Sequence, residues 1–115
     1  MSVERVDAGP VVVGCVVALA GLLFLAEPFV GPVAVGGADV PVGALSFVVL
    51  AVAFDLGAVV FYRRGQRTVA LAHGVAGLGW TLVVVGPFVG GLPLLWLGIA
   101  VVVGGSAFLV VELAR

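Results

Sequence analysis

Residues 42–62 read VGALSFVVLAVAFDLGAVVFY, a run of 21 positions with one charged residue, and RRGQR follows at 63–67. A helix needs about 20 mainly apolar residues to cross a hydrocarbon core of about 30 Å. The run is therefore long enough to cross a bilayer, and the arginines after it mark where the chain leaves the apolar layer. This stretch predicts a transmembrane helix.

Three further apolar runs, at about 10–26, 68–87 and 93–111, accompany it, and breaks of Gly, Pro or Arg separate all four. The composition agrees, because 63% of the 115 residues are hydrophobic and 10% are charged, whereas soluble domains have about 45–50% and about 25%. Valine and glycine are abundant in the runs, but in lipid a lone segment must satisfy its own backbone as a helix. We expect a single all-α membrane domain over 1–115, built as a four-transmembrane-helix bundle.

The sequence leaves two alternatives to four membrane-spanning helices. A closed β-barrel would show segments of about 10 residues with alternating polar and apolar positions, and these runs do not alternate. The first run could instead be a cleaved secretory signal, because Arg5 precedes it and the small residues at 18–20 have the spacing of a cleavage site. Glu4 and Asp7 dilute the positive charge, however, and the run continues past that site, so we expect the first helix to be retained.

The arginines predict the orientation in the membrane. The chain has five arginines and no lysine: Arg5 precedes the first run, three arginines lie within 63–67, and Arg115 ends the chain. With four crossings, all five fall on one side. Because short loops rich in arginine stay in the cytoplasm, we expect a multi-pass protein of the cell membrane with cytoplasmic N and C termini.

Aromatic residues fit this arrangement. Tyr62 falls at the cytoplasmic boundary, and Phe29, Phe88 and Trp96 fall near the outer boundary, where membrane proteins concentrate aromatic side chains. Trp80 lies well inside the third run and does not belong to either boundary. We expect it to pack between helices.

The tetrapeptide PFVG occurs at 28–31 and again at 87–90, near the outer end of the first and third helices. This suggests a duplicated helical hairpin, with two parallel halves related by an axis along the membrane normal. Convergence is the alternative, because Pro and Gly commonly end helices.

The segment 33–41 lies outside the four runs, between the first and the second. Gly36-Gly37 in its middle is typical of a two-residue turn. A small β-hairpin over the outer face is therefore predicted, with a disordered loop as the alternative.

Each helix carries one polar or polarizable residue at a similar depth. Asp55 precedes Tyr62 by seven residues and His73 is five residues into the third run, which places both about 8–10 Å from the cytoplasmic end at about 1.5 Å per residue. An ionised Asp inside a bilayer costs about 2.5–3.5 kcal/mol, and His73 is the partner nearest in depth. With Ser106 and Cys15, these residues form a candidate intramembrane polar layer.

Two interpretations of this layer are open. A hydrogen-bonded clasp between Asp55, His73 and Ser106 would set the helix register. A proton or cation relay through Asp55 and His73 is the other interpretation, since ionisable residues inside a membrane often mark transport pathways. A pathway should continue to the outer face, where the helices offer only Ser46, Thr81 and Glu27. This favours the clasp.

The chain has 18 glycines, more than twice the average share of about 7%. Small residues four apart let helix backbones approach closely in lipid, and such pairs occur on all four helices. The candidate packing pairs are Gly14 with Ala18, Ala53 with Gly57, Ala70 with Gly74, and Ala100 with Gly104. One compact bundle does not need so many, so we expect packing against further copies or another membrane subunit.

Other function classes find little support. The net charge of −1 provides no basic face for nucleic acid, a single cysteine cannot build a multi-cysteine metal site, and no enzyme or nucleotide motif is present. We expect no enzyme activity, cofactor or metal site. The predicted role is a structural or accessory subunit of a membrane oligomer or complex; the alternative is a small homo-oligomeric channel or proton-coupled transporter using Asp55 and His73.

Overall fold

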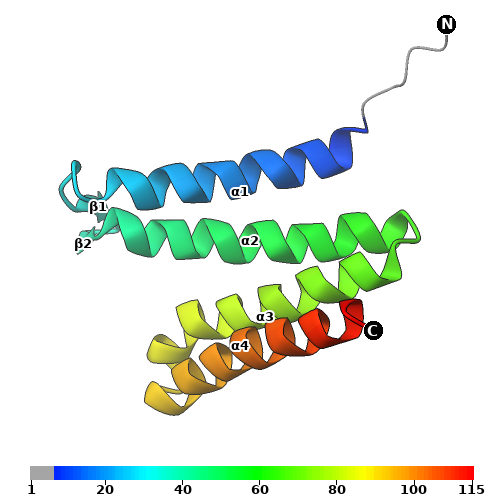
Figure 1. Cartoon of the computed structure of the whole chain (residues 1–115). Coiled ribbons are helices and arrows are strands. Elements are labelled where there is room, and N and C mark those ends of the chain that lie inside the picture. The colour runs from blue at the N-terminus through cyan, green and yellow to red at the C-terminus, as the bar shows by residue number, and fades with distance from the viewer. Residues whose placement is uncertain (1–6) are drawn as a thin grey trace, which may run out of the picture.

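The structure, a computed structural model, describes residues 7–115 and consists of four long helices and one short hairpin (Figure 1). The elements are, in chain order, α1 (Ala8–Ala26), β1 (Val33–Val35), β2 (Ala38–Val40), α2 (Val42–Arg63), α3 (Arg67–Val89) and α4 (Leu92–Leu113). All four helices are long and apolar enough to cross a membrane. The predicted helices are confirmed, and each boundary lies within two residues of its expected position.

The helices form an open row in which each packs against the one before it in the chain: α1 on α2, α2 on α3, and α3 on α4. Consecutive helices run in opposite directions (Figure 1). The start of α1, the α2–α3 turn and the end of α4 therefore lie at one end of the row, and the hairpin and the α3–α4 turn lie at the other. We call these the arginine end and the hairpin end.

Four arginines lie at the arginine end: Arg63, Arg64, Arg67 and Arg115. Arg64 forms an ion pair with Asp7, whose Oδ1 also accepts a hydrogen bond from the backbone N of Gly9 at 3.1 Å and so caps α1. This pair ties the start of α1 to the α2–α3 turn. Arg115 pairs with Glu112 at 3.7 Å. The expectations that rest on Glu4 and Arg5 lie outside the described residues.

The β-hairpin predicted between the first two helices is confirmed. Strands β1 and β2 pair antiparallel, with Val33 opposite Val40 and Val35 opposite Ala38. Gly36 and Gly37 join them with φ angles of 57° and 83°. A tight turn of this kind needs positive φ at both central residues, which glycine adopts without a steric penalty.

Aromatic residues lie as expected. Trp80 on α3 stacks on Phe47 of α2 with ring centroids 5.4 Å apart, and Phe47 also meets Phe24 of α1 at 6.5 Å, so the predicted packing of Trp80 between helices is confirmed. Tyr62 is exposed at the arginine end. The other boundary aromatics, Phe29, Phe88 and Trp96, are exposed at the hairpin end.

The interior of the row contains small side chains. Among the described residues, the buried ones other than glycine are Val13, Ala20, Val42, Ser46, Ala51, Ala53 and Ala70. Many larger apolar side chains, namely valine, leucine and phenylalanine, are exposed on the outer surfaces of the helices. Such a surface suits a lipid solvent, in which helices gain little by hiding apolar side chains and associate instead by close backbone packing.

The backbones of α3 and α4 approach each other closely. A methyl group on Gly98 would lie 2.8 Å from the carbonyl oxygen of Gly79 and 2.8 Å from the backbone N of Val83. Gly86 lies seven residues after Gly79 on α3 and meets the backbone of Leu95. Gly105 lies seven residues after Gly98 on α4 and meets the side chain of Val75. Two glycines seven residues apart on each helix, Gly79 and Gly86 on α3 and Gly98 and Gly105 on α4, therefore lie in this contact, and none of them belongs to the predicted pairs four residues apart.

Two of the predicted packing pairs lie within helix contacts. Ala53 is completely enclosed (0% exposed), Gly57 lies under the ring of His73, and Gly74 faces Ala58, beside the buried Ala70. The other two pairs, Gly14 with Ala18 and Ala100 with Gly104, lie on the exposed outer surfaces of α1 and α4. Within the described chain these surfaces have no neighbouring helix.

Candidate functional site

Asp55 lies on the surface of the chain, deep along α2. It is eight residues before Arg63, which places it about 12 Å from the arginine end of the helix and close to the middle of a hydrocarbon core of about 30 Å. The residue is exposed, and its Oδ2 accepts a hydrogen bond from Oγ1 of Thr81 on α3 at 3.0 Å. An ionisable group thus faces the surroundings of the chain at mid-membrane depth.

A shallow cleft of about 200 Å³ surrounds this pair of polar groups. We call it the Asp55 cleft; it is lined by Val48, Ala51, Val52, Asp55, Thr81, Val84 and Val85. Apart from the hydroxyl of Thr81, the side chains around the carboxyl group are apolar. The cleft therefore offers a polar centre inside an apolar rim.

His73 lies elsewhere on the α2–α3 contact. Its Nδ1 lies 2.9 Å from the carbonyl oxygen of Val69 in the preceding turn of the same helix, so Nδ1 carries the hydrogen and donates it. The ring centroid is 5.8 Å from that of Phe54 and 4.8 Å from that of Phe61. The hydrogen bond expected between Asp55 and His73 is replaced by one from Thr81 to Asp55 and one from His73 to Val69.

Glycines of the facing helix explain this arrangement. Asp55 lies against Gly77 of α3, and the imidazole of His73 lies against Gly57 of α2; a methyl group on either glycine would overlap the polar side chain. Residues 73 and 77 are one turn apart on α3, about 6 Å along the axis. Each polar side chain fills the space above a different glycine, and the two do not meet.

Ser106 and Cys15 do not join Asp55 either. Both are exposed, and they lie on α4 and α1, the two edges of the helix row. The four residues of the predicted polar layer are therefore spread across the chain. Within residues 7–115, no group of three His, Cys, Asp or Glu side chains could hold a metal ion.

Two polar contacts between helices involve residues that the sequence analysis noted only as outer-half polar groups. Thr81 is the partner of Asp55. Ser46, which is 4% exposed, donates a hydrogen bond from Oγ to the carbonyl oxygen of Ala20 at 2.7 Å and so joins α2 to α1. The sequence shows both residues, but it does not show which side of its helix meets a neighbour.

Glu27 closes the α1–α2 contact at the hairpin end. Its carboxylate lies against Gly43 in the first turn of α2, leaving no room for a methyl group there. The first residue before α2 is Pro41, which provides no side-chain cap. A negative charge beside a helix N-terminus is favourable because it meets the positive end of the helix dipole. Glu27 therefore stabilises the N-terminus of α2 at the hairpin end.

The four apolar helices, with large apolar side chains facing outward, are those of a small multi-pass membrane protein. No family model, curated protein or solved structure matches the chain. Its role is therefore inferred from its own residues.

Proposed function

We propose that the chain is a structural or accessory subunit of a membrane oligomer or complex, in which a neighbouring subunit covers the Asp55 cleft. One observation carries the proposal: a carboxyl group is exposed near the middle of the membrane thickness, and Thr81 is its hydrogen-bond partner in the described chain. A lipid tail has no donor to offer, and an ionised Asp at this depth costs about 2.5–3.5 kcal/mol. A neighbouring helix can provide a donor and exclude lipid.

The outer surfaces of α1 and α4 support contacts with further subunits. A Cβ on Gly14 or Gly104 would meet nothing within 4 Å, and Ala18 and Ala100 beside them are exposed. In lipid, such small surfaces let another helix approach to van der Waals contact. Small residues on the outer surfaces of α1 and α4, together with the Asp55 cleft on α2 and α3, therefore suit a chain that packs against other subunits.

We further infer that the arginine end faces the cytoplasm and that the protein resides in the cell membrane. Arg63, Arg64, Arg67 and Arg115 lie at one end of the row, and arginine-rich short loops stay on the cytoplasmic side. The hairpin end has Glu27 and Asp39 and no positive charge.

A duplicated hairpin, α1–α2 and α3–α4, is supported by the recurrence of PFVG at 28–31 and 87–90 and by the antiparallel packing within each pair. The two copies of the tetrapeptide differ locally, since Pro28 follows the end of α1 and Pro87 lies inside α3. Pro41 follows Pro28 by 13 residues and Pro93 follows Pro87 by six, and the seven additional residues of the first loop accommodate the β-hairpin.

Photo-crosslinking from the Asp55 cleft tests the proposal. We expect Val52→Cys, in a Cys15→Ala background and labelled with benzophenone maleimide in native membranes, to give protein adducts on illumination. Val52 lines the cleft and is 54% exposed, so a probe there would touch whatever covers Asp55. The masses of the adducts identify the neighbour as a second copy or another protein.

The matched control is Val69→Cys on α3, which is 40% exposed and lines neither the Asp55 cleft nor the outer surfaces of α1 and α4. It should give fewer protein adducts if neighbours are specific to the cleft. Asp55→Leu in the Val52→Cys protein should lower the adduct yield while the helix content stays unchanged. Absence of protein adducts at Val52, or equal yields at both positions, would contradict the proposal.

The alternative role, a channel or proton-coupled transporter, makes the opposite prediction in liposomes. We expect no proton flux above background from the reconstituted chain, because within the described residues Asp55 pairs with Thr81 and His73 with Val69, and no hydrogen bond joins Asp55 to His73. A flux in the parent protein that Asp55→Asn abolishes would instead support transport. Dye-loaded liposomes under an imposed pH gradient provide the measurement, with His73→Ala as a second test of the relay.

A further inference from the structure

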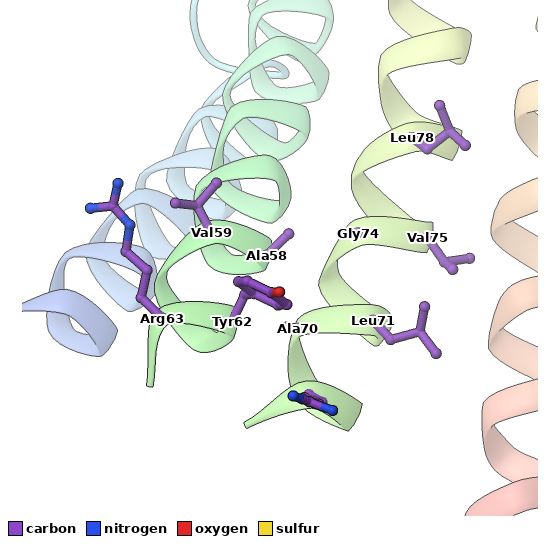
Figure 2. A pocket seen from close by; sticks show the side chains of 10 residues that line it. Ala58, Val59, Tyr62, Arg63, Ala70, Leu71, Gly74, Val75 and Leu78 are labelled. Carbon is purple, nitrogen blue, oxygen red and sulfur yellow. The ribbon is translucent and has the colours of Figure 1, made fainter. Parts of the chain in front are cut away.

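A larger hollow, which we call the arginine-end trough, runs along α2 and α3 between the Asp55 cleft and the arginine end. Its volume is about 710 Å³. Figure 2 shows Val59 and Tyr62 on the α2 side and Leu71, Val75 and Leu78 on the α3 side. The trough has Ala58, Ala70 and Gly74 at its base, and these small residues leave space above them. The trough is open toward the surroundings of the chain and almost entirely apolar along its length.

The polar groups of the trough gather at one end. Arg63 and Arg67 line this end, and the ring of Tyr62 lies between the two helices there (Figure 2), with 67% of the residue exposed. In Figure 2, Arg63 extends from α2 on the side away from α3. Arg67, at the first position of α3, is therefore the cation that we place at the mouth of the trough.

The described side chains do not balance the charges around the trough. Within residues 7–115, the side-chain carboxylates at this end are Asp7 and Glu112, and both already pair with other arginines, Arg64 and Arg115. No ion pair in the described chain involves Arg63 or Arg67. The described side chains of a second copy thus provide no unpaired carboxylate at this end, which favours an anion from another source.

The length of the trough matches one leaflet. From Arg67 to Leu78 is 11 residues, about 16 Å along the helix, or about half of a hydrocarbon core of about 30 Å. A molecule that fills it has a negative head at the membrane surface and an apolar tail of one leaflet's depth. That combination describes a phospholipid.

We propose that the arginine-end trough binds a phospholipid with an anionic headgroup. Its phosphate lies at the guanidinium of Arg67 and the hydroxyl of Tyr62, with Arg63 as a second cation, and an acyl chain lies over Ala58, Ala70 and Gly74. Basic sites between transmembrane helices hold anionic headgroups by this combination of charge and hydrogen bonding. The trough and the Asp55 cleft share no lining residue, so the lipid and a neighbouring subunit occupy different parts of the α2–α3 surface.

Lipid binding to the purified full-length chain tests this proposal. Native mass spectrometry in mild detergent would compare phosphatidylglycerol with phosphatidylcholine carrying identical acyl chains. We expect tighter binding of phosphatidylglycerol, weakened about fivefold by Arg67→Gln and less by Arg63→Gln, the loss expected for one cation near an anionic surface. Binding of phosphatidylcholine should weaken less in either variant, because its choline cation offsets the charge of its phosphate.

Two further variants separate the headgroup site from general effects. Arg115→Gln removes the same charge at the same end, outside the trough, and should leave both affinities unchanged. Gly74→Leu fills the floor and should weaken both lipids alike; its first added atom meets only the Cβ of Ala58, at 3.8 Å. Circular dichroism would confirm equal helix content in all variants.

Three results would overturn the proposal. Equal affinities for the two lipids would show that the headgroup is not recognised. Equal losses of affinity in Arg67→Gln and Arg115→Gln would show that binding does not depend on the trough. Displacement of phosphatidylglycerol by excess inorganic phosphate would indicate a site for a free anion. In membranes, a benzophenone on Leu71→Cys should form lipid adducts, whereas adducts to a second copy would show that protein fills the trough.

Discussion

Gly98→Ala is expected to break the contact between α3 and α4 and to lower the free energy of unfolding by about 3 kcal/mol, the upper part of the range for an overpacked interior. The added methyl group would lie 2.8 Å from the carbonyl oxygen of Gly79 and 2.8 Å from the backbone N of Val83. Both are backbone atoms, so no side-chain rotation relieves the overlap. Unfolding in mixed micelles of mild detergent and dodecyl sulfate, followed by circular dichroism, gives the measurement.

Gly104→Ala is the matched control on the same helix. Its methyl group would meet nothing within 4 Å, and alanine is favoured over glycine in a helix by up to about 1 kcal/mol. Gly104→Ala should therefore be neutral or slightly stabilising. Equal destabilisation by the two substitutions would show that glycine itself, and not the close approach at Gly98, matters for stability.

Gly57→Ala should destabilise the α2–α3 contact by about 2 kcal/mol, and replacing His73 should relieve most of that loss. The new methyl group would overlap the imidazole ring, which is confined by Phe54 and Phe61. In the double variant Gly57→Ala/His73→Ala the overlap disappears. The same unfolding measurement on all four proteins should give a coupling free energy of about 1–2 kcal/mol, within the range for residues in contact.

Gly74→Ala provides the control for this cycle, because it lies in the same helix contact with room for a methyl group, 3.8 Å from the Cβ of Ala58. We expect its effect to be small and to add to that of His73→Ala. Additive effects of Gly57→Ala and His73→Ala would contradict the packing of the ring on Gly57.

The helices of this protein were predictable because lipid leaves the backbone few options. An apolar run such as 42–62 must form a helix to satisfy its own N–H and C=O groups, and its length follows from the membrane thickness. The observed helix ends differ from the predicted ones by at most two residues. Helix α1, for example, begins at Ala8, because Asp7 caps its N-terminus. The β-hairpin was predictable from Gly36-Gly37, because few residues other than glycine adopt two successive positive φ angles.

The contacts within the membrane were less predictable, because sequence does not show how each helix is rotated. Depth predicted that Asp55 and His73 lie at a similar level, but the glycines opposite them, Gly77 and Gly57, direct the two side chains to different spaces. Thr81 was visible in the sequence as a polar residue one turn beyond Gly77. Only the rotation of α3 makes it the partner of Asp55.

The glycines show the same limit. Spacing of four identified Gly57 and Gly74, which lie at helix contacts, and equally Gly14 and Gly104, which face outward. In a chain with so many glycines, spacing alone does not separate the two groups. The repeat of seven on both α3 and α4 was a further signal, since it places glycines on one face of each of two consecutive helices.

Packing between consecutive helices has a consequence for synthesis. Each helix meets its main partner as soon as it leaves the ribosome, because that partner is the helix made just before it. Contacts so close in sequence form early and quickly, and none has to wait for a distant segment to enter the membrane. The growing chain can thus be inserted and folded one helix at a time, from α1 onward.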